Sequence, residues 1–307
     1  MNKNPSCRLC NAKPEKQFVR ASNVYGDNEG DYKFYQCRTC DLVYLWPIPS
    51  EEQENYFYAI EFEKYMENRS GEERDWSGPE AHKKSNLDNV IRRMKFLEKY
   101  MIKGASILEI GCSSGFMMDK FRELGLKPVG VEPSGVFTNY LKENGHEVYK
   151  NIDELRSHSN IKFDIIVSFF VLEHIRNTKN FLLDQMMLIN QNGIVIAEVP
   201  CVNDPLTSLY DIPAFENFYW SIAHHYYFNP KSISVVLDKI NCKYDIIPEQ
   251  RYDLSNHMIW MQKGKPGGQG QYSSIISEIT NNNYKEDLKS SWSCDTFFLK
   301  IEPNKDN

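Results

Sequence analysis

The sequence predicts an α/β protein in which a mostly parallel β-sheet is covered by helices on both faces. From about residue 105, short apolar runs typical of buried strands alternate with amphipathic stretches of helical length. These segments end at glycine or proline, as expected where a strand gives way to a turn. The chain is 307 residues long, enough for one large α/β domain and a smaller module.

The expected elements follow one another in alternation. Strands are expected at 106–110, 127–131, 163–169 and 194–199, and helices at 116–124, 136–143 and 181–189. Asn229 and Pro230 predict the start of a later helix, since asparagine caps helices and proline fits their first turn. Residues 244–247 and 296–301 are expected as further strands, the second as an antiparallel strand closing the edge of the sheet.

Composition excludes several classes of protein. Hydrophobic content is 41%, charged content is 25% and the net charge is −6, so neither global disorder nor a nucleic-acid-binding surface is expected. Residues 1–7 lack the apolar core of a signal peptide, and no apolar run reaches the roughly 20 residues that cross a bilayer. We therefore expect a soluble, cytoplasmic protein with no membrane segment.

Four consecutive parts are expected along the chain. They are a metal-binding module (1–50), a helical linker (51–103), a core domain (104–250) with an aromatic lid at 204–228, and an acceptor-side insertion with the closing strand (251–307).

The turn after the first expected strand predicts a nucleoside pocket. Gly111 and Gly115 allow the backbone to turn tightly and to approach a ligand closely. Glu132 ends the second strand about twenty residues later, where a carboxylate can accept both hydroxyls of a ribose. A nicotinamide site would require glycine where this chain has Ser113, so a ligand without a pyrophosphate is favoured.

A series of motifs resembles the class I methyltransferases, which have a Rossmann-like fold and use S-adenosylmethionine. The similar segments are 108–115 (LEIGCSSG), 130–134 (GVEPS), 163–168 (FDIIVS) with 171–175 (VLEHI), and 192–193 (NG) with 198–200 (EVP). The family usually has glycine where this chain has Ser113, and serine fits many such loops. The resemblance spans about residues 105–202.

This resemblance implies the residues that bind the cofactor. Glu109, Gly111 and Gly115 would hold its amino-acid end, Glu132 its ribose, and Asn151 would lie near the adenine. The full set of implied cofactor-binding residues also includes Cys112, Ser113, Pro133, Ser168 and Phe169, the last two bordering the sulfonium.

Two C-x-x-C pairs predict a structural zinc site. Cys7, Cys10, Cys37 and Cys40 provide four thiolates, which suit tetrahedral zinc and leave no open coordination position. A redox dithiol would need a thioredoxin-like setting, which these residues lack. Residues 37–50 and 56–57 resemble the zinc-knuckle leader of a methyltransferase subgroup that includes sugar methyltransferases. The resemblance implies a sugar acceptor in surface-polysaccharide biosynthesis.

Residues 204–228 contain eight aromatic residues and two histidines, which predicts a lid with stacking surface. Methyl transfer to oxygen requires removal of a proton, and histidine is the natural base near neutral pH. His224 resembles the family histidine, and His225 and His174 are further candidates; each could instead cap a helix or shape a loop.

Residues beyond 250 supply candidates for acceptor binding, namely Arg251, Tyr252 and His257. The turn at 264–268 contains glycines and Lys265, so it could hold a phosphate, or it could be a plain surface turn.

Four functions are compatible with the sequence. The leading hypothesis is O-methylation of a sugar or sugar nucleotide. A C-methyltransferase of a nucleotide-linked keto-deoxysugar uses the same cofactor but needs a carbonyl beside the attacked carbon. An RNA-modifying methyltransferase is disfavoured by the acidic chain. A non-catalytic scaffold is disfavoured by the intact glycine loop and Glu132.

Overall fold

The computed structural model describes residues 4–57, the single positions 60, 65 and 69, and residues 78–158 and 161–304. The chain forms two compact units. The first unit consists of Met1–Pro49, Leu172–Phe181 and Glu198–Leu299, and the second of Ser50–Val171, Leu182–Ala197 and Lys300–Asn307. Both units combine segments that are distant in the sequence, whereas the sequence analysis expected consecutive parts.

A seven-stranded sheet is the largest element of the fold. Its strands are β4 (Ser106–Ile110), β5 (Lys127–Val131), β6 (Glu147–Tyr149), β7 (Phe163–Phe169), β8 (Ile189–Pro200), β10 (Cys242–Glu249) and β11 (Thr296–Pro303). The strand order is β10-β11-β8-β7-β4-β5-β6. Parallel pairing joins β4 to both β5 and β7, and β5 to β6. The predicted class is confirmed: the sheet is mostly parallel, with an antiparallel region toward one edge.

The position predicted for the closing strand was wrong. β11 lies between β8 and β10, and β10 and β6 form the edges of the sheet. Phe297, Phe298 and Leu299 are consecutive and no more than 1% exposed, so β11 is buried on both faces. Burial on both faces is typical of a central strand. An apolar run predicts a strand, but it does not specify the neighbours of that strand.

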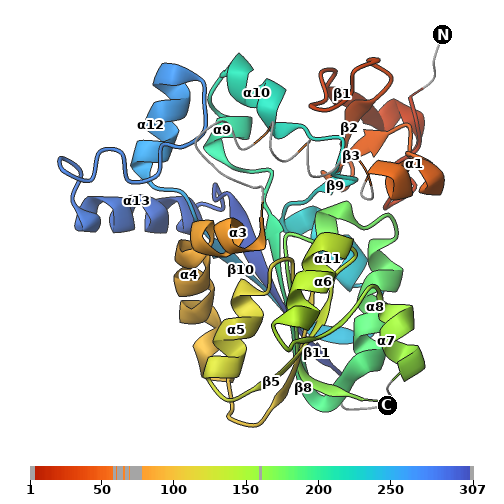
Figure 1. Cartoon of the computed structure of the whole chain (residues 1–307). Helices are drawn as coiled ribbons and strands as arrows, with labels where there is room; N and C mark the ends of the chain where they lie inside the picture. The colour runs from red at the N-terminus through yellow and green to blue at the C-terminus, as the bar shows by residue number, and fades with distance from the viewer. Residues whose placement is uncertain are drawn as a thin grey trace. The chain divides into compact units, whose positions relative to one another are not determined.

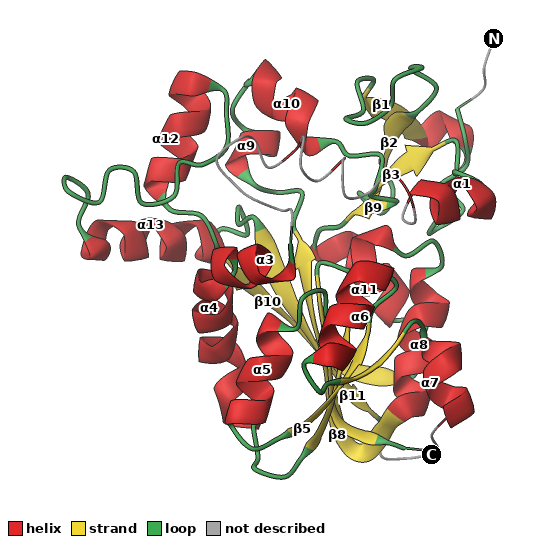
Figure 2. Cartoon of the chain, viewed as in Figure 1, coloured by secondary structure: helices red, strands yellow, loops and turns green. Residues whose placement is uncertain are grey.

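Several helices belong to the described part of the second unit. They are α1 (Glu51–Tyr56), α3 (Pro79–Ser85), α4 (Leu87–Leu97), the 3-10 turn Glu98–Tyr100, α5 (Phe116–Glu123), α6 (Gly135–Glu143), α7 (Ile152–His158) and α8 (Thr178–Leu188), which begins in the first unit. In Figure 2, α4 and α5 lie on one side of the strands and α7 and α8 on the other. The helical pattern expected over 51–103 is present where the structure describes it; positions 58–59, 61–64, 66–68 and 70–77 of that range lie outside the described residues.

A second, antiparallel sheet belongs to the first unit. It pairs β1 (Gln17–Ala21), β2 (Lys33–Cys37), β3 (Val43–Trp46) and β9 (Tyr226–Tyr227) in that order (Figure 1). The expectations for residues 1–50 included a metal-binding module but none of these strands. β1, β2 and β3 pair with one another within residues 17–46, and β9 joins β3 from about 180 residues away in the chain. A local pattern does not contain that information.

Most of the described helices of the first unit follow β8 in the chain. They are η4 (Leu172–His174, before α8), α9 (Pro205–Ser208), α10 (Pro213–Tyr219), α11 (Pro230–Leu237), α12 (Leu254–Lys263) and α13 (Glu278–Ser290), and the short turn η1 (Pro14–Lys16) precedes β1. The predicted start of α11 is confirmed: the Asn229 side chain accepts the N–H of Ser232, and Pro230 is the first helical residue. None of the described helices is both long and apolar enough to span a bilayer.

Much of the aromatic segment 204–228 forms the interior of the first unit. Trp220 and Tyr227 are no more than 1% exposed, and both rings pack on Phe34 of β2, with centroid distances of 5.4 and 5.2 Å. Five of its eight aromatic side chains are buried. These rings therefore stabilise the fold through apolar burial and ring packing, in place of the stacking surface expected from the sequence.

Candidate active site

The carboxyl ends of three parallel strands meet at one edge of the second unit. Ile110 at the end of β4 pairs with Val131 of β5 and with Ser168 of β7. The residues that follow these strands therefore lie together, at the point where β4 has its two neighbours on opposite sides. Open α/β sheets bind ligands at such a point.

The loop after β4 needs glycine for both conformation and space. Gly111 and Gly115 have φ angles of 76° and 79°. A Cβ atom at Gly111 would lie 2.5 Å from Val171 Cγ2, and one at Gly115 would lie 2.4 Å from Leu141 Cδ2. Ser113 also has a positive φ, 49°, which a side chain adopts at a cost. That conformation explains why the resembling family usually has glycine at this position.

Glu132 is hydrogen-bonded to the glycine loop. Its carboxylate accepts the N–H of Ser113 at 2.7 Å through Oε2 and the N–H of Ser134 at 2.9 Å through Oε1. The residue is 6% exposed, and burial raises the pKa of its carboxyl although the two N–H groups act in the opposite direction. The two hydrogen bonds fix the carboxylate at the end of β5, beside the turn.

Glu109 is a buried acid with an unused acceptor. It is 2% exposed, and among the described residues its Oε2 has no hydrogen-bond partner. Burial raises the pKa of Glu109 to about 8, while the Arg93 guanidinium acts in the opposite direction. A buried acceptor without a donor is costly, so this carboxyl group is suited to receive a ligand's donor.

Arg93 and His82 were missed in the sequence. Arg93 of α4 is 3% exposed, and its guanidinium carbon lies 4.2 Å from the centroid of the Phe169 ring. His82 of α3 lies 2.8 Å from Ser114 Oγ through its Nδ1. Burial lowers the pKa of His82 to about 4, with a smaller contribution from Arg93. Both side chains come from helices that precede β4, so spacing around the motif gave no signal for them.

The other predicted cofactor residues have different settings. Ser168 is 1% exposed, and its Oγ has no hydrogen-bond partner among the described residues. Cys112 packs its side chain in a buried cluster with Met118, which leaves only its backbone to face a ligand. Asn151 is exposed, and its Oδ1 accepts the N–H of Glu154 as a cap of α7. Pro133 is exposed beside Glu132.

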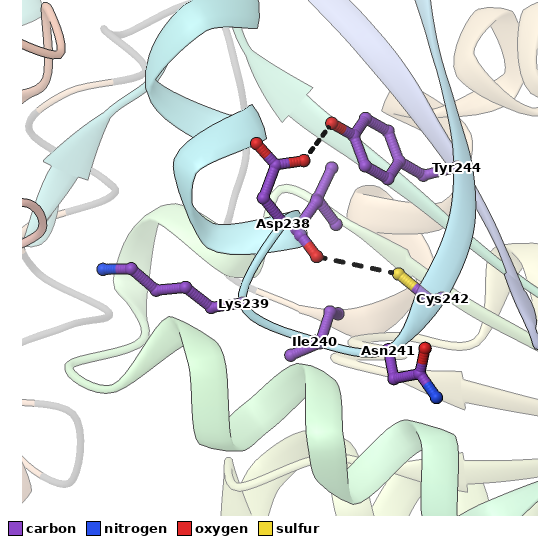
Figure 3. Close-up of a pocket in the computed structure, with 7 residues that line it drawn as sticks. Asp238, Lys239, Ile240, Asn241, Cys242 and Tyr244 are labelled. Carbon is purple, nitrogen blue, oxygen red and sulfur yellow. Dashed lines mark hydrogen bonds between the residues drawn. The ribbon is translucent and has the colours of Figure 1, made fainter.

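None of the residues that line the hollow shown in Figure 3 is a predicted site residue. It has a volume of about 450 Å³ and is lined by residues 237–242 and Tyr244, at the turn between α11 and β10. The Tyr244 hydroxyl donates to Asp238 Oδ1 at 2.6 Å within it. The residues that line it include neither a glycine nor a glutamate, the residue types of the turn after β4 and the acid after β5.

The four predicted zinc ligands are brought together in the first unit. Cys7 Sγ lies 3.6 Å from Cys40 Sγ, and Cys10 Sγ lies 3.7 Å from Cys37 Sγ. All four sulfurs lie within 4.8 Å of one another. Four thiolates around tetrahedral zinc, with Zn–S bonds of about 2.3 Å, have sulfur–sulfur distances of about 3.8 Å. The donor set and its spacing fit zinc.

A second polar cluster of the first unit contains Glu173, His174 and His224. One ligand-type atom from each residue lies within 4.8 Å of the others, and the two imidazole rings meet edge to face with centroids 4.6 Å apart. His174 Nδ1 lies 2.7 Å from the carbonyl of Ala223, so this nitrogen carries the proton that is donated. Glu173 is 1% exposed, and burial raises its pKa to about 8.

His225 is buried apart from this cluster. Its side chain is held by Arg8, with Nη1 of Arg8 3.3 Å from His225 Nδ1. The neighbouring His224 is only partly buried. The two adjacent histidine side chains thus have different settings.

The three predicted acceptor residues lie in the first unit. Asp295 accepts the backbone N–H groups of Arg251 and Tyr252 at 3.0 and 3.2 Å, and the Arg251 side chain lies 3.5 Å from the same carboxylate. His257 is fully buried, and its Nδ1 lies beside the hydroxyl of Tyr284 at 2.5 Å. Its Nε2 has no hydrogen-bond partner in the described part of the chain.

The parallel sheet, the glycine turn after β4 and the acid after β5 define the class: these are features of a class I S-adenosylmethionine-dependent methyltransferase. The chain belongs to the family described as "Methyltransferase domain", whose model matches residues 82–245. Residues 82–245 therefore form a methyltransferase domain.

Individual relatives are distant. A ubiquinone biosynthesis O-methyltransferase of Rickettsia canadensis is 30% identical over 120 residues, which cover 35% of this chain and 50% of that protein. The chain spans half or less of the length of the ubiquinone enzymes that it matches first. A ribosomal protein L11 methyltransferase of Thermosipho africanus is 26% identical over 253 residues, which cover 69% of this chain and 90% of that protein.

The similar solved structures are also distant in sequence. An S-adenosylmethionine-dependent methyltransferase from Archaeoglobus fulgidus aligns with 70% of this chain and 93% of its own, with a TM-score of 0.48 and 16% identity. The names of these relatives give no support to the sugar acceptor expected from the cysteine leader.

Proposed function

We propose that the protein transfers the methyl group of S-adenosylmethionine to an oxygen of a small-molecule acceptor, with a sugar or sugar nucleotide of surface-polysaccharide biosynthesis as the first candidate. The observation that carries the cofactor assignment is the pair of hydrogen bonds from Ser113 and Ser134 to Glu132. These bonds hold a carboxylate that can accept ribose hydroxyls beside the turn that contains Gly111 and Gly115. A cytoplasmic location remains a prediction from the sequence.

The cofactor residues have complementary roles in this proposal. Glu132 would accept the ribose hydroxyls, while the glycine loop leaves room for the ligand to approach the backbone. The unpartnered Oε2 of Glu109 would accept the ammonium of the amino-acid end. Bound there, S-adenosylmethionine supplies an electrophilic methyl group on its sulfonium.

The proposed base is His224, with His174 beside it. Methyl transfer to a hydroxyl requires the oxygen to align with the methyl group and to lose its proton. His174 donates through Nδ1 to Ala223, which leaves its Nε2 as an acceptor when the ring is neutral. The edge-to-face packing of the two rings restricts their orientations. Arg251, Tyr252 and His257 remain proposed acceptor-binding residues.

Comparing cells with and without the gene tests the function. We expect glycans or sugar nucleotides from gene-containing cells to include a species heavier by about 14 daltons, as methylation by such an enzyme adds. Purified protein with labelled methyl donor should then be offered hydroxy-sugar and keto-sugar nucleotides side by side. Label on the keto substrate alone would favour C-methylation; label on neither, with no mass difference in cells, would contradict the sugar proposal.

Cofactor affinity should depend on pH through Glu109. Because burial raises its pKa to about 8, the carboxyl is neutral in the free protein at pH 6 and must ionise to pair with an ammonium group. We therefore expect the dissociation constant of S-adenosylhomocysteine, measured by calorimetry, to decrease by up to about 50-fold between pH 6 and pH 8. Stability of the free protein should change the other way: the free energy of unfolding falls as pH rises from about 4.5 to 8, since the native state retains this proton.

Glu109→Gln is the matched control, because it keeps the shape but cannot titrate. Arg93, Glu132 and Asp119 are the charged groups that act on Glu109, and the variant leaves all three in place. The affinity of this variant for S-adenosylhomocysteine should change little between pH 6 and pH 8. A dependence as steep as that of the natural protein would assign the titration to another group, with Glu132 the first to examine.

We also propose that Cys7, Cys10, Cys37 and Cys40 bind one structural zinc ion. Purified protein should contain about one zinc per chain by mass spectrometry, and Cys37→Ser should lose it. Cys242→Ser, a change at an isolated half-buried cysteine, should retain it. Because structural zinc contributes folding energy, chelation should also lower the melting temperature. A metal-free natural protein with unchanged melting temperature in chelator would contradict the assignment.

A further inference from the structure

Each cysteine knuckle has an arginine after its first cysteine, and the two arginines make different contacts. Arg8 Nη1 lies 3.3 Å from the carbonyl oxygen of Leu45 and 3.3 Å from His225 Nδ1. Its guanidinium carbon also lies 4.5 Å from the centroid of the Tyr226 ring. Arg38 instead covers the Phe18 ring at 4.7 Å, within the cysteine module itself. Of these two arginines, Arg8 is the one whose described contacts reach the histidine segment.

Backbone hydrogen bonds also connect the cysteine module to the histidine segment. β3 follows directly after the second knuckle, and it pairs with β9 through Val43 with Tyr227 and Tyr44 with Tyr226. The N–H of Leu45 then donates to the carbonyl of His225 at 3.0 Å. The residue after His224 is therefore held by β3 through its main chain and by Arg8 through its side chain.

Residues 223–225, which contain the proposed base His224, are also bonded to residues 173–174. The N–H of His225 donates to the carbonyl of Glu173 at 2.8 Å, and His174 Nδ1 donates to the carbonyl of Ala223 at 2.7 Å. These two bonds tie residues 223–225 to residues 173–174, whose imidazole contacts His224. A displacement of His225 would therefore move the residues on both sides of His224.

The contact with Arg8 also fixes the tautomer of His225. A guanidinium group has five N–H donors and no acceptor, so His225 Nδ1 must be the acceptor of this hydrogen bond. The ring proton of His225 then lies on Nε2. Because Nδ1 is already engaged, the base role between the adjacent histidines falls to His224.

We propose that Arg8 is a positioning residue for methyl transfer. It is part of the four-cysteine module, and by holding His225 in place it restricts the position of the neighbouring His224. The inference rests on the proposed role of His224 as base. The cysteine module thereby has a second task besides stability, which is to set the geometry of the acceptor-side histidines. Even about 1 Å of misplacement at a reacting group can cost a hundredfold in rate.

Arg8→Ala and Arg38→Ala form a matched pair for the test. Cells lacking the gene would receive each variant at equal protein level, and the species heavier by 14 daltons would be quantified. We expect Arg8→Ala to reduce its formation roughly 10- to 100-fold and Arg38→Ala to change it less than twofold. S-adenosylhomocysteine affinity should stay within twofold for both purified variants. Arg8→Lys should be intermediate, because one ammonium replaces a planar group with several donors.

Two further measurements separate positioning from folding. Millimolar guanidinium should partly restore product formation in lysates of Arg8→Ala, and in neither Arg38→Ala nor His224→Ala. In nitrogen NMR of histidine-labelled protein, the signal of His225 should report the Nε2–H tautomer, and Arg8→Ala should convert it to a mixture.

The outcomes are distinct for the two proposals. Equal product formation by Arg8→Ala and Arg38→Ala would overturn the inference. Loss of zinc together with activity in Arg8→Ala, without rescue by guanidinium or by Arg8→Lys, would assign Arg8 a purely structural role. If His224→Ala keeps full product formation, the proposed base fails, whereas the NMR effect of Arg8→Ala would still report its hold on His225.

Discussion

His224→Ala should lower the rate of methyl transfer by roughly 10²- to 10⁴-fold, the usual contribution of a positioned general base. The acceptor hydroxyl must lose its proton as its oxygen attacks the methyl group, and alanine removes the proposed acceptor of that proton. Cofactor affinity should change less than twofold, because the glycine loop and Glu132 belong to a different part of the chain. Methyl transfer is measured with labelled donor and the acceptor found by mass spectrometry, and affinity by calorimetry.

His158→Ala is the control for this prediction. His158 is an exposed histidine at the end of α7, where it bonds to Ser157 and Glu154 and its ring packs beside Tyr149. His158→Ala should therefore keep the full rate of methyl transfer. If His224→Ala is as active as this control while His174→Ala is not, the base would be His174; if both retain activity, neither histidine removes the proton.

Glu132→Ala should weaken binding of S-adenosylhomocysteine by about 100-fold, or roughly 2.7 kcal/mol. The change removes the proposed partner of the ribose, and it also leaves the N–H groups of Ser113 and Ser134 without their acceptor. Hydrogen bonds to a charged group contribute about 1.5–3 kcal/mol each. Loss of the proposed bonds between Glu132 and the ribose hydroxyls therefore accounts for the expected effect. Calorimetry on the purified variant gives the affinity directly.

Two control variants define the effect of Glu132→Ala. Glu143→Ala removes an exposed carboxylate at the end of α6 and should leave affinity unchanged. Cys201→Ala alters a buried thiol of the other unit and should have a much smaller effect than Glu132→Ala. Equal losses in Glu132→Ala and Cys201→Ala would show that the ribose assignment is wrong.

Local pattern was sufficient for most of the core sheet. The bounds predicted for β4, β5 and β7 match the structure, because each is a buried apolar run that ends at a turn or a functional residue. The helix beginning at Asn229 was predicted from its cap. By contrast, β6, α7 and α13 were missed, since β6 has only three residues and α13 has no buried face to produce an apolar period.

The cofactor side of the site was more predictable than the acceptor side. Gly111, Gly115 and Glu132 lie within about twenty residues of chain, and parallel pairing of adjacent strands brings them together. Arg93 and His82 were not predicted, because an arginine or histidine on a helix before the sheet carries no mark of burial. Among the histidines, the resemblance singled out His224, with His225 and His174 as further candidates, and contacts with distant residues are what distinguish their settings.

The sequence by itself determined the methyltransferase class, the glycine turn and the identity of the four thiolates, since each depends on residue type at short spacing. Tertiary structure decided the rest: the place of β11 inside the sheet, the pairing of β3 with β9, and the separation of His224 from His225 by Arg8. The physical reason is that these features arise from hydrogen bonds and packing between residues far apart in the chain, which no local pattern records.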